Sequence, residues 1–209
     1  MLLLSIKIYR NCSVRKAYCL LFIGLMYNGA FAQNVATING KPLTSREFMW
    51  VYKKSHNGNS TTDYNKLQEY LWQYINFKLK VLDAREMGLD QDSSYKSEIK
   101  VYEDAVAAHR KPGSKNKEKD YLLSEYREGV LMFNVSEEKI WNRVQQDDEG
   151  LRAFFDQNHK KYADKPLNEI RGQVMTDYQQ FLENNWIKFL QQKYQIKINE
   201  NELKKLTKQ

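Results

Sequence analysis

The residue types that most often catalyse reactions or bind metals are sparse in this chain. Its 209 residues include three histidines, His56, His109 and His159, and no two of them stand at the helical spacing of a metal-ligand pair. Both cysteines, Cys12 and Cys19, lie within the first 32 residues. The sequence contains no phosphate-binding glycine loop, nucleophile elbow or HExxH motif. We therefore expect no catalytic residue, no cofactor and no metal ion.

The run Asp147-Asp148-Glu149-Gly150 is the one acidic stretch that could be taken for a metal loop. A calcium loop needs oxygen ligands at alternating positions and a bidentate glutamate at its end, and this run has neither. Acids are common in the first turn of a helix because they interact favourably with the helix dipole. The run therefore predicts the start of a short helix, with Leu151, Phe154 and Phe155 on its apolar side.

The segment from Asp63 to Met87 is predicted to be the central element of the fold. It has 25 residues without Gly or Pro and is followed by Gly88, a common helix stop. Residues 76 to 81 alternate as in a strand, but a strand of the whole length would be far outside the ordinary range. The segment is therefore expected to be one helix. Its apolar residues cover roughly two thirds of the circumference, which predicts a central helix surrounded by others.

Two cations, Lys78 and Arg85, are seven residues apart and so lie on one line of this helix, and both fall inside its apolar arc. We expect their aliphatic stems to cover apolar surface while their charges reach acids nearby. A ligand-binding role for these two cations is the alternative.

Aromatic side chains of the same helix are the candidate contacts for an extended polypeptide. Aromatic rings provide a large contact area and tolerate water at one edge. The candidates are Trp72, Tyr70 and Phe77, and Trp72 lies at the margin of the apolar arc, where partial exposure is expected. The alternative is that these rings only fill the core.

Residues 1–32 are expected to be a signal peptide. An apolar stretch at 17–26 ends near Ala30-Phe31-Ala32, a small-x-small pattern that predicts cleavage before Gln33. An uncleaved anchor is the alternative; after cleavage we expect a periplasmic protein without stable membrane insertion. Four cations precede the apolar stretch, namely Lys7, Arg10, Arg15 and Lys16. Without these four cations the chain has 29 Lys and Arg and 26 Asp and Glu. This near balance of charge does not indicate binding to nucleic acid.

Residues 33–108 are predicted to form an N-terminal helical module. Val35 to Gly40 should be a short strand that ends in an Asn-Gly turn. Thr44-Ser45-Arg46-Glu47 matches a capping box, which predicts a helix from Ser45 to Lys54. After the central helix, a further helix should reach about Ala108.

Residues 109–119 carry five cations and a Pro-Gly pair, and we interpret them as a basic linker; a site for a polyanion or a lipid surface is the alternative. Residues 120–209 should be a C-terminal helical segment that packs back on the module. In it we predict a helix that ends at Gly129, an extended segment at 130–135 and a long helix from Leu167 to Lys193. Tyr194 to Asn199 alternates as a strand.

The fold class that follows is mainly α. We expect a multi-helix body, a long C-terminal helix and a small two-stranded sheet that pairs the N-terminal strand with the C-terminal strand.

Four segments resemble the SurA-type periplasmic chaperones, which are exported peptidyl-prolyl isomerases of the parvulin class. INFKLKVLDAREMGLDQDSSYKSEI at 75–99 and ATINGKPLTSREF at 36–48 are similar to the N-terminal helical module of that family. Residues 125–162 and 169–199 resemble the segments that follow the isomerase domains and return to the module. Residues 109–119 and 163–166 leave no room for a parvulin domain, so the chain resembles the chaperone core alone.

The resemblance implies a SurA N-terminal-like fold and an ATP-independent periplasmic holdase for unfolded outer-membrane or exported proteins. A residual peptidyl-prolyl cis-trans isomerase and a structural subunit of an envelope complex are the alternatives, so enzyme activity stays open. The implied partners are unfolded polypeptides. A homodimer formed by exchange of the long C-terminal helix also stays open, because such an exchange costs little free energy.

Overall fold

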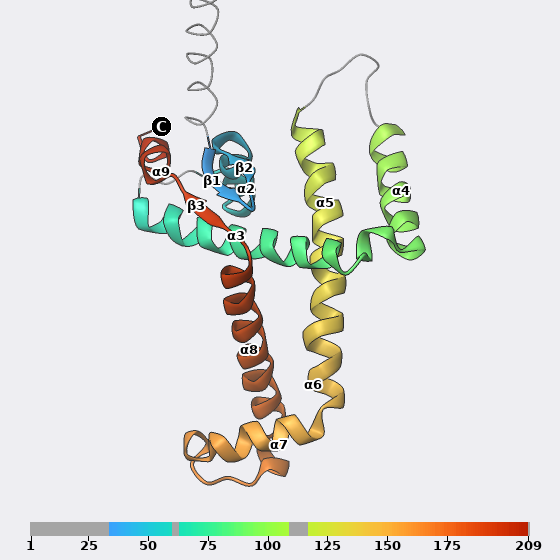
Figure 1. Ribbon diagram of the computed structural model, residues 1–209, viewed down its shortest axis with the longest axis vertical. Helices are drawn as coiled ribbons and strands as arrows, with labels where there is room; N and C mark the ends of the chain where they lie inside the picture. The colour runs from blue at the N-terminus through green and yellow to red at the C-terminus, as the bar shows by residue number, and fades with distance from the viewer. Residues whose placement is uncertain (1–33, 60–62, 109–116, 209) are drawn as a thin grey trace, which may run out of the picture.

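The computed structural model describes residues 34–59, 63–108 and 117–208, and within them the protein is mainly α with one small sheet, as predicted (Figure 1). The expected signal peptide at 1–32 and residues 109–116 of the expected linker lie outside the described residues. None of the described helices is both long enough and apolar enough to cross a membrane.

The sheet joins the two ends of the described chain. β1 (Asn34–Ile38) is its central strand and pairs antiparallel with β3 (Ile196–Ile198), which confirms the predicted pairing. A third strand, β2 (Lys41–Thr44), was not predicted and makes the sheet three-stranded rather than two-stranded. Asn39 and Gly40 both have positive φ, 49° and 77°, and this tight hairpin turn folds β2 back onto β1.

Two capped helices follow the sheet. α2 (Ser45–Ser55) begins as predicted, because Thr44 Oγ1 accepts a hydrogen bond from the amide of Glu47 at 3.2 Å. α3 (Tyr64–Glu86) confirms the predicted central helix, and Gly88 after it has the left-handed φ of 79°. The residues of α3 that are fully buried lie at helical spacing: Leu67, Leu71, Ile75, Leu79, Val81 and Ala84.

The next helices correct the prediction for the middle of the chain. A short 3-10 turn, η3 (Leu89–Gln91), precedes α4 (Ser93–Ala108), and α5 (Lys117–Ser136) then runs without a break through residues 129–135. The predicted helix end at Gly129 and the extended segment after it are therefore wrong. Glycine costs a helix interior about 1 kcal/mol, but Leu131 and Val135, one turn apart, are buried. Burial outweighs the local preference.

A π-helical turn, η4 (Glu137–Trp141), continues α5 into α6 (Asn142–Gln146). α7 (Asp148–Gln157) begins at the acidic run, and Asp147 caps it by accepting from the amide of Gly150 at 2.8 Å, so the predicted short helix is confirmed. The 3-10 turn η5 (His159–Tyr162) follows.

The long C-terminal helix, α8 (Leu167–Lys193), has the predicted bounds and a kink at Ile170. After β3 the chain forms α9 (Glu200–Leu206), which was not predicted. Leu203 and Leu206 of α9 are buried, and Ser45 Oγ donates to Glu202 Oε1 at 2.8 Å. The C-terminal end thus packs on the start of α2.

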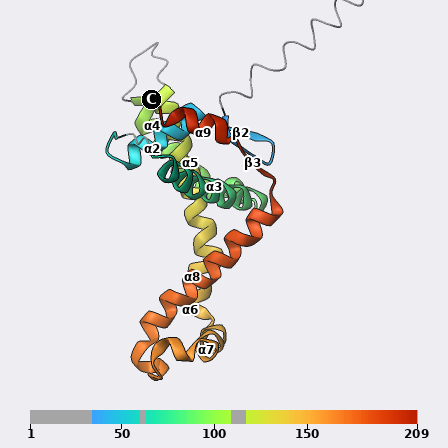
Figure 2. The same cartoon turned by 90° about the vertical axis from the view of Figure 1, so that its left-hand side faces the viewer.

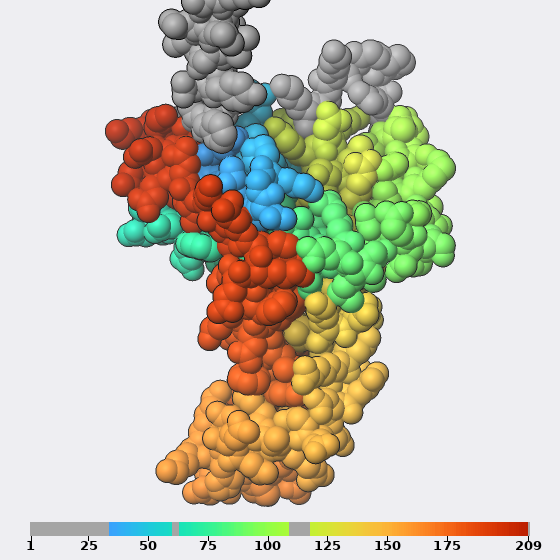
Figure 3. All heavy atoms as spheres, in the orientation of Figure 1, coloured from blue at the N-terminus to red at the C-terminus, as the bar shows by residue number. Residues whose placement is uncertain are grey.

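The helices form an upper body and a narrower stalk. α3 crosses the base of the upper body, beneath the sheet, α2 and α9, while α4 and the first half of α5 stand beside them (Figures 1 and 2). The second half of α5, with η4 and α6, descends along α8 to α7 at the foot. The space-filling view shows the lower half narrowing to these segments (Figure 3).

Candidate functional site

The three aromatic residues expected to bind a polypeptide do not lie together. Tyr70 and Phe77 line the same hollow, of about 340 Å³, between α2, α3 and α5. Both rings are half-buried. Trp72 is 37% exposed and is not among the residues that line this hollow.

This hollow is the middle one of three neighbouring hollows beside α5, which together we call the α5 groove. The first, of about 310 Å³, lies between the sheet, α2, α3 and α5, and the third, of about 610 Å³, lies between α4 and α5. Val51 and Tyr74 line both the first and the middle hollow, Gly129 lines the middle and the third, and Glu125 lines all three. The shared residues make the hollows immediate neighbours.

Aromatic side chains follow the groove from end to end. The rings of Trp50 and Tyr121 are 5.5 Å apart in the first hollow, and Tyr74 stacks on Phe77 at 5.8 Å at the boundary with the second. Tyr102 stacks on Tyr126 at 3.7 Å in the third. Phe133, which is 51% exposed, lies in the third hollow as well. Exposed apolar and aromatic surface of this extent marks an interaction site.

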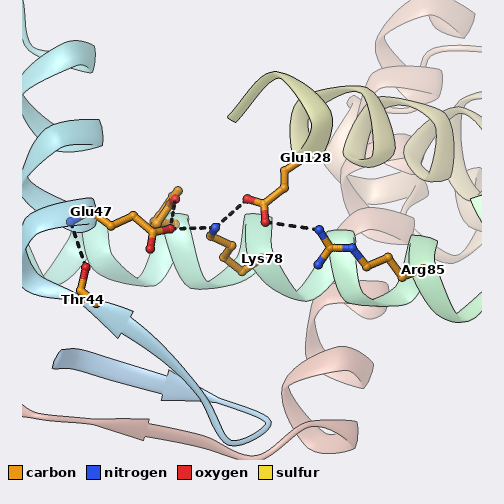
Figure 4. Close-up of polar contacts among 6 residues, drawn as sticks. Thr44, Glu47, Lys78, Arg85 and Glu128 are labelled. Atoms are coloured by element: carbon orange, nitrogen blue, oxygen red, sulfur yellow. Dashed lines mark hydrogen bonds and ion pairs between the residues drawn. The ribbon is translucent and has the colours of Figure 1, made fainter. Parts of the chain in front are cut away.

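In the lining of the first hollow, a chain of ion pairs joins α2, α3 and α5 (Figure 4). Lys78 Nζ lies 2.9 Å from Glu47 Oε1 and 2.6 Å from Glu128 Oε2. Arg85 reaches the other oxygen of Glu128 at 3.5 Å. The two cations of the apolar arc therefore do meet acids, as the sequence predicted, and those acids come from two other helices.

Tyr74 completes this cluster. Its hydroxyl donates to Glu47 Oε1 at 3.0 Å. Burial, and then the negative charges of Glu47 and Glu128, hold the pKa of Tyr74 far above its usual range, because all of them disfavour the phenolate. Tyr74 is thus a neutral donor at any physiological pH.

The carboxylates of the groove are all engaged by partners. Glu47 and Glu128 bind Lys78, Glu125 pairs with Lys54, and Glu98 accepts a hydrogen bond from the hydroxyl of Tyr126 at 3.0 Å. Among the described residues, no three His, Cys, Asp or Glu side chains gather closely enough to hold a metal ion. Such a groove is suited to binding through apolar area with a solubilising charged margin, rather than to proton transfer.

The contribution of α5 to the site was missed by the sequence reasoning. Leu122, Tyr126, Val130 and Phe133 follow one another at intervals of three or four residues, which is the spacing of one helix face. They line the third hollow together. Reading Gly129 as the end of the helix broke this pattern in two and hid it.

The chain is similar to a curated protein of Campylobacter jejuni subsp. jejuni from two strains. It is 28% identical over 134 residues to the "Putative peptidyl-prolyl cis-trans isomerase Cbf2" of Campylobacter jejuni subsp. jejuni, in strain 81-176 and in strain NCTC 11168. The match covers 63% of this chain, and the chain spans about 40% of the length of these relatives. No family model matches the chain. No solved structure matches it either. The chain is thus a distant relative of a protein named as a peptidyl-prolyl isomerase.

Proposed function

We propose that the protein is an ATP-independent holdase, which binds extended segments of unfolded, exported polypeptides in the α5 groove. The observation that carries the proposal is the row of three aromatic hollows that share Glu125. Their volumes fall in or near the range of about 300 to 1,000 Å³ that is usual for binding pockets. A row of separate hollows suits a chain that inserts successive side chains.

The charged residues of the groove support such a role. Lys54 and Glu125 pair at the groove, with side chains 48% and 31% exposed, so they keep a hydrated margin beside the apolar lining. The more buried pair of Lys78 with Glu128 holds α3 and α5 at a constant separation. Aromatic contact of this kind is sequence-tolerant, and release by exchange with another segment needs no nucleotide.

The place and the partners belong to the same proposal. Residues 1–32, which have the pattern of a signal peptide, support export to the periplasm. That compartment contains no ATP, and unfolded outer-membrane proteins pass through it. Tyr70 and Phe77 lie in the groove and would contact the client directly. Trp72, exposed on the same helix, would contact a client only beyond the groove.

A second candidate function is peptidyl-prolyl cis-trans isomerisation. The similarity to a protein of that name favours it. A protease-coupled assay with a proline peptide decides between the two functions. An isomerisation rate equal to the uncatalysed rate would exclude the isomerase. A catalysed rate that is abolished by filling the α5 groove would show that the groove is an isomerase site rather than a holdase site.

The holdase proposal is tested by filling the groove at Gly129. A Cβ atom placed on Gly129 meets nothing within 4 Å, so a leucine there would project into the open space between the middle and third hollows. Gly172 of α8 is a matched control, since its Cβ also meets nothing and it lines none of the three hollows.

The purified protein is mixed with an unfolded outer-membrane barrel, and aggregation is followed by light scattering. We expect suppression by the wild type and by Gly172→Leu, and a loss of about fivefold or more in potency for Gly129→Leu, because a blocked apolar pocket forfeits about 1 kcal/mol or more. Equal potency of the two variants would contradict a role for the groove, and no suppression by the wild type would end the proposal.

A further inference from the structure

Another hollow, which shares no lining residue with the α5 groove, lies on the stalk. It has a volume of about 450 Å³ and opens between η4, α6 and α8; we call it the stalk hollow. Its apolar lining consists of Ile140, Phe181, Leu182, Trp186 and Phe189. The exposed fractions of Phe181 and Phe189 are 45% and 55%, so two large rings are left in water beside it. Apolar exposure of this kind indicates a binding surface.

The exposed rings are placed by the period of α8. Phe181, Asn185 and Phe189 follow one another at intervals of four residues, so they lie on one side of the helix. Eight residues of helix span about 12 Å, which is the length of about four residues of an extended chain at about 3.3 Å each. The two rings therefore match two side chains of an extended segment rather than one compact small molecule.

The floor of the hollow is rigid. Trp186 is nearly buried and donates its indole N–H to Asp83 Oδ2 of α3 at 2.9 Å. Phe181 packs on Phe154 of α7, with the ring centroids 5.3 Å apart. A surface held from both sides in this way loses little entropy on binding.

The charge of the stalk hollow distinguishes it from the α5 groove. Its lining includes the cations Lys139 and Arg143 and the amide Asn185, and no carboxylate. Lys139 also pairs with the buried Asp83, and the Nε atom of Arg143 lies 3.3 Å from Asp147. Even with that pair, the side chain of Arg143 is 57% exposed. The α5 groove, in contrast, has acids in each of its hollows.

The π-helical turn puts the cations there. Lys139 and Ile140 belong to η4, and Arg143 follows at the start of α6. A π-helical turn is less favourable than the α-helix that it interrupts, and such turns are frequent at functional sites. The wider turn brings Lys139 and Ile140 to the same hollow as the aromatic face of α8.

We propose that the stalk hollow binds an extended polypeptide segment in which carboxylate side chains stand between two aromatic ones. The rings of the segment would lie against Phe181 and Phe189, and its carboxylates would face Arg143 and Lys139. The stalk hollow would select acidic aromatic segments, and it deepens the proposed holdase function, on which its biological use rests, by adding a subsite of defined chemistry.

The test uses two blocked peptides with a neutral fluorophore, Gly-Phe-Asp-Ser-Asp-Phe-Gly and the same peptide with Lys in place of each Asp. Binding to the whole protein is measured by fluorescence anisotropy. We expect the Asp peptide to bind about fivefold more tightly, since each half-exposed ion pair contributes about 0.2 to 1 kcal/mol and about 1.4 kcal/mol corresponds to tenfold. Phe189→Ala and Arg143→Gln should each weaken it about threefold to fivefold.

Arg152→Gln is the matched control, because Arg152 is an exposed arginine on α7 that does not line the hollow. It should leave the affinity for the Asp peptide unchanged. Thermal unfolding of every variant tests whether its fold is intact. If loss of the Arg143 contact to Asp147 disturbs α7, Phe189→Ala still tests the proposal, because Phe189 is exposed.

Three results would overturn the proposal: equal affinity for the two peptides, an equal effect of Arg152→Gln and Arg143→Gln, or a dimer that Phe189→Ala converts to monomer, which would assign the surface to a second copy of the chain. Gly129→Leu should leave binding of the Asp peptide unchanged. Failure of the stalk hollow can therefore be told apart from failure of the α5 groove.

Discussion

Trp186 donates its indole N–H to Oδ2 of Asp83 at 2.9 Å, and this bond joins α8 to α3 across 103 residues of sequence. Asp83 is only 3% exposed and is also paired with Lys139 of η4 and, at 3.5 Å, with Lys193 of α8. One carboxylate thus holds both helical segments of the stalk, η4 and α8, against the central helix α3.

Replacing Asp83 should loosen the stalk. Asp83→Ala leaves Lys139 without its partner and the indole N–H of Trp186 without its acceptor, so we expect a loss of about 3 kcal/mol in the free energy of unfolding. Urea unfolding measures it. Asp104→Ala removes the exposed pair with Lys100 and should leave the free energy of unfolding almost unchanged. Equal losses would show that burial of Asp83 does not matter.

The two lysine pairs of the α5 groove should differ in the same sense. In Lys78→Met the stem that covers apolar surface is kept, but Glu128, which is buried, retains only the longer contact to Arg85. We expect a loss of about 2 kcal/mol, because removing one partner leaves a desolvated charge. Lys54→Met breaks the more exposed pair with Glu125 and should cost at most about 1 kcal/mol. Chemical denaturation compares them, and the reverse order would refute this reading.

Two glycines should respond to alanine in opposite directions. Gly129→Ala adds a methyl group that meets nothing within 4 Å, so the helix preference alone acts and should stabilise the protein by about 1 kcal/mol. Gly150→Ala would force the methyl group against Asp147 Oδ2 and the hydroxyl of Tyr178. Since both groups belong to the cap of α7, the melting temperature should fall. A rise in both variants would show that α7 can shift at no cost.

Alkaline pH should destabilise the fold through buried tyrosines. The raised pKa of Tyr74 means that the folded protein keeps a proton which the unfolded chain loses above about pH 10. The corresponding stability is present below that pH and is lost as pH rises further. Tyr194, whose pKa burial raises to about 12, acts in the same sense. Phenylalanine has no such proton, so the urea midpoint of Tyr74→Phe should fall less steeply with pH.

At neutral pH the wild type should be the more stable of the two proteins. Tyr74→Phe loses the hydrogen bond to Glu47 and should be less stable than the wild type by about 1 kcal/mol. The two stability curves should therefore converge as the pH is raised. Parallel curves between about pH 9 and pH 11 would show that Tyr74 does not control the alkaline transition.

Local rules predicted most elements of this fold because their causes lie close together in the sequence. Thr44 and Glu47 are three residues apart, and their capping bond starts α2 where the motif placed it. The same holds for the length of α3, for Gly88 after it and for the bounds of α8. The alternation of the terminal segments was enough to predict that β1 pairs with β3. α9 was missed because seven residues hold too little periodicity.

Where local and tertiary effects disagreed, the tertiary effect won. Gly129 favours the end of a helix, yet burial of Leu131 and Val135 extends α5 through it. The candidate Trp72 shows the same limit from the other side. A wheel placed it at the margin of α3, and the structure exposes it there, but only the packing of α2 and α5 decides that Tyr70 and Phe77 share a hollow while Trp72 does not.

The sequence by itself determined that Lys78 and Arg85 must find acids, because a charge on an apolar helix face is costly unless it is paired. Which acids they find was decided by the tertiary structure, since Glu47 and Glu128 lie on other helices and Lys78 meets Glu128 across 50 residues. Capping and periodicity depend on neighbours within a few residues. The hollows of the α5 groove depend on how three helices approach one another, and no pattern within one of them records that approach.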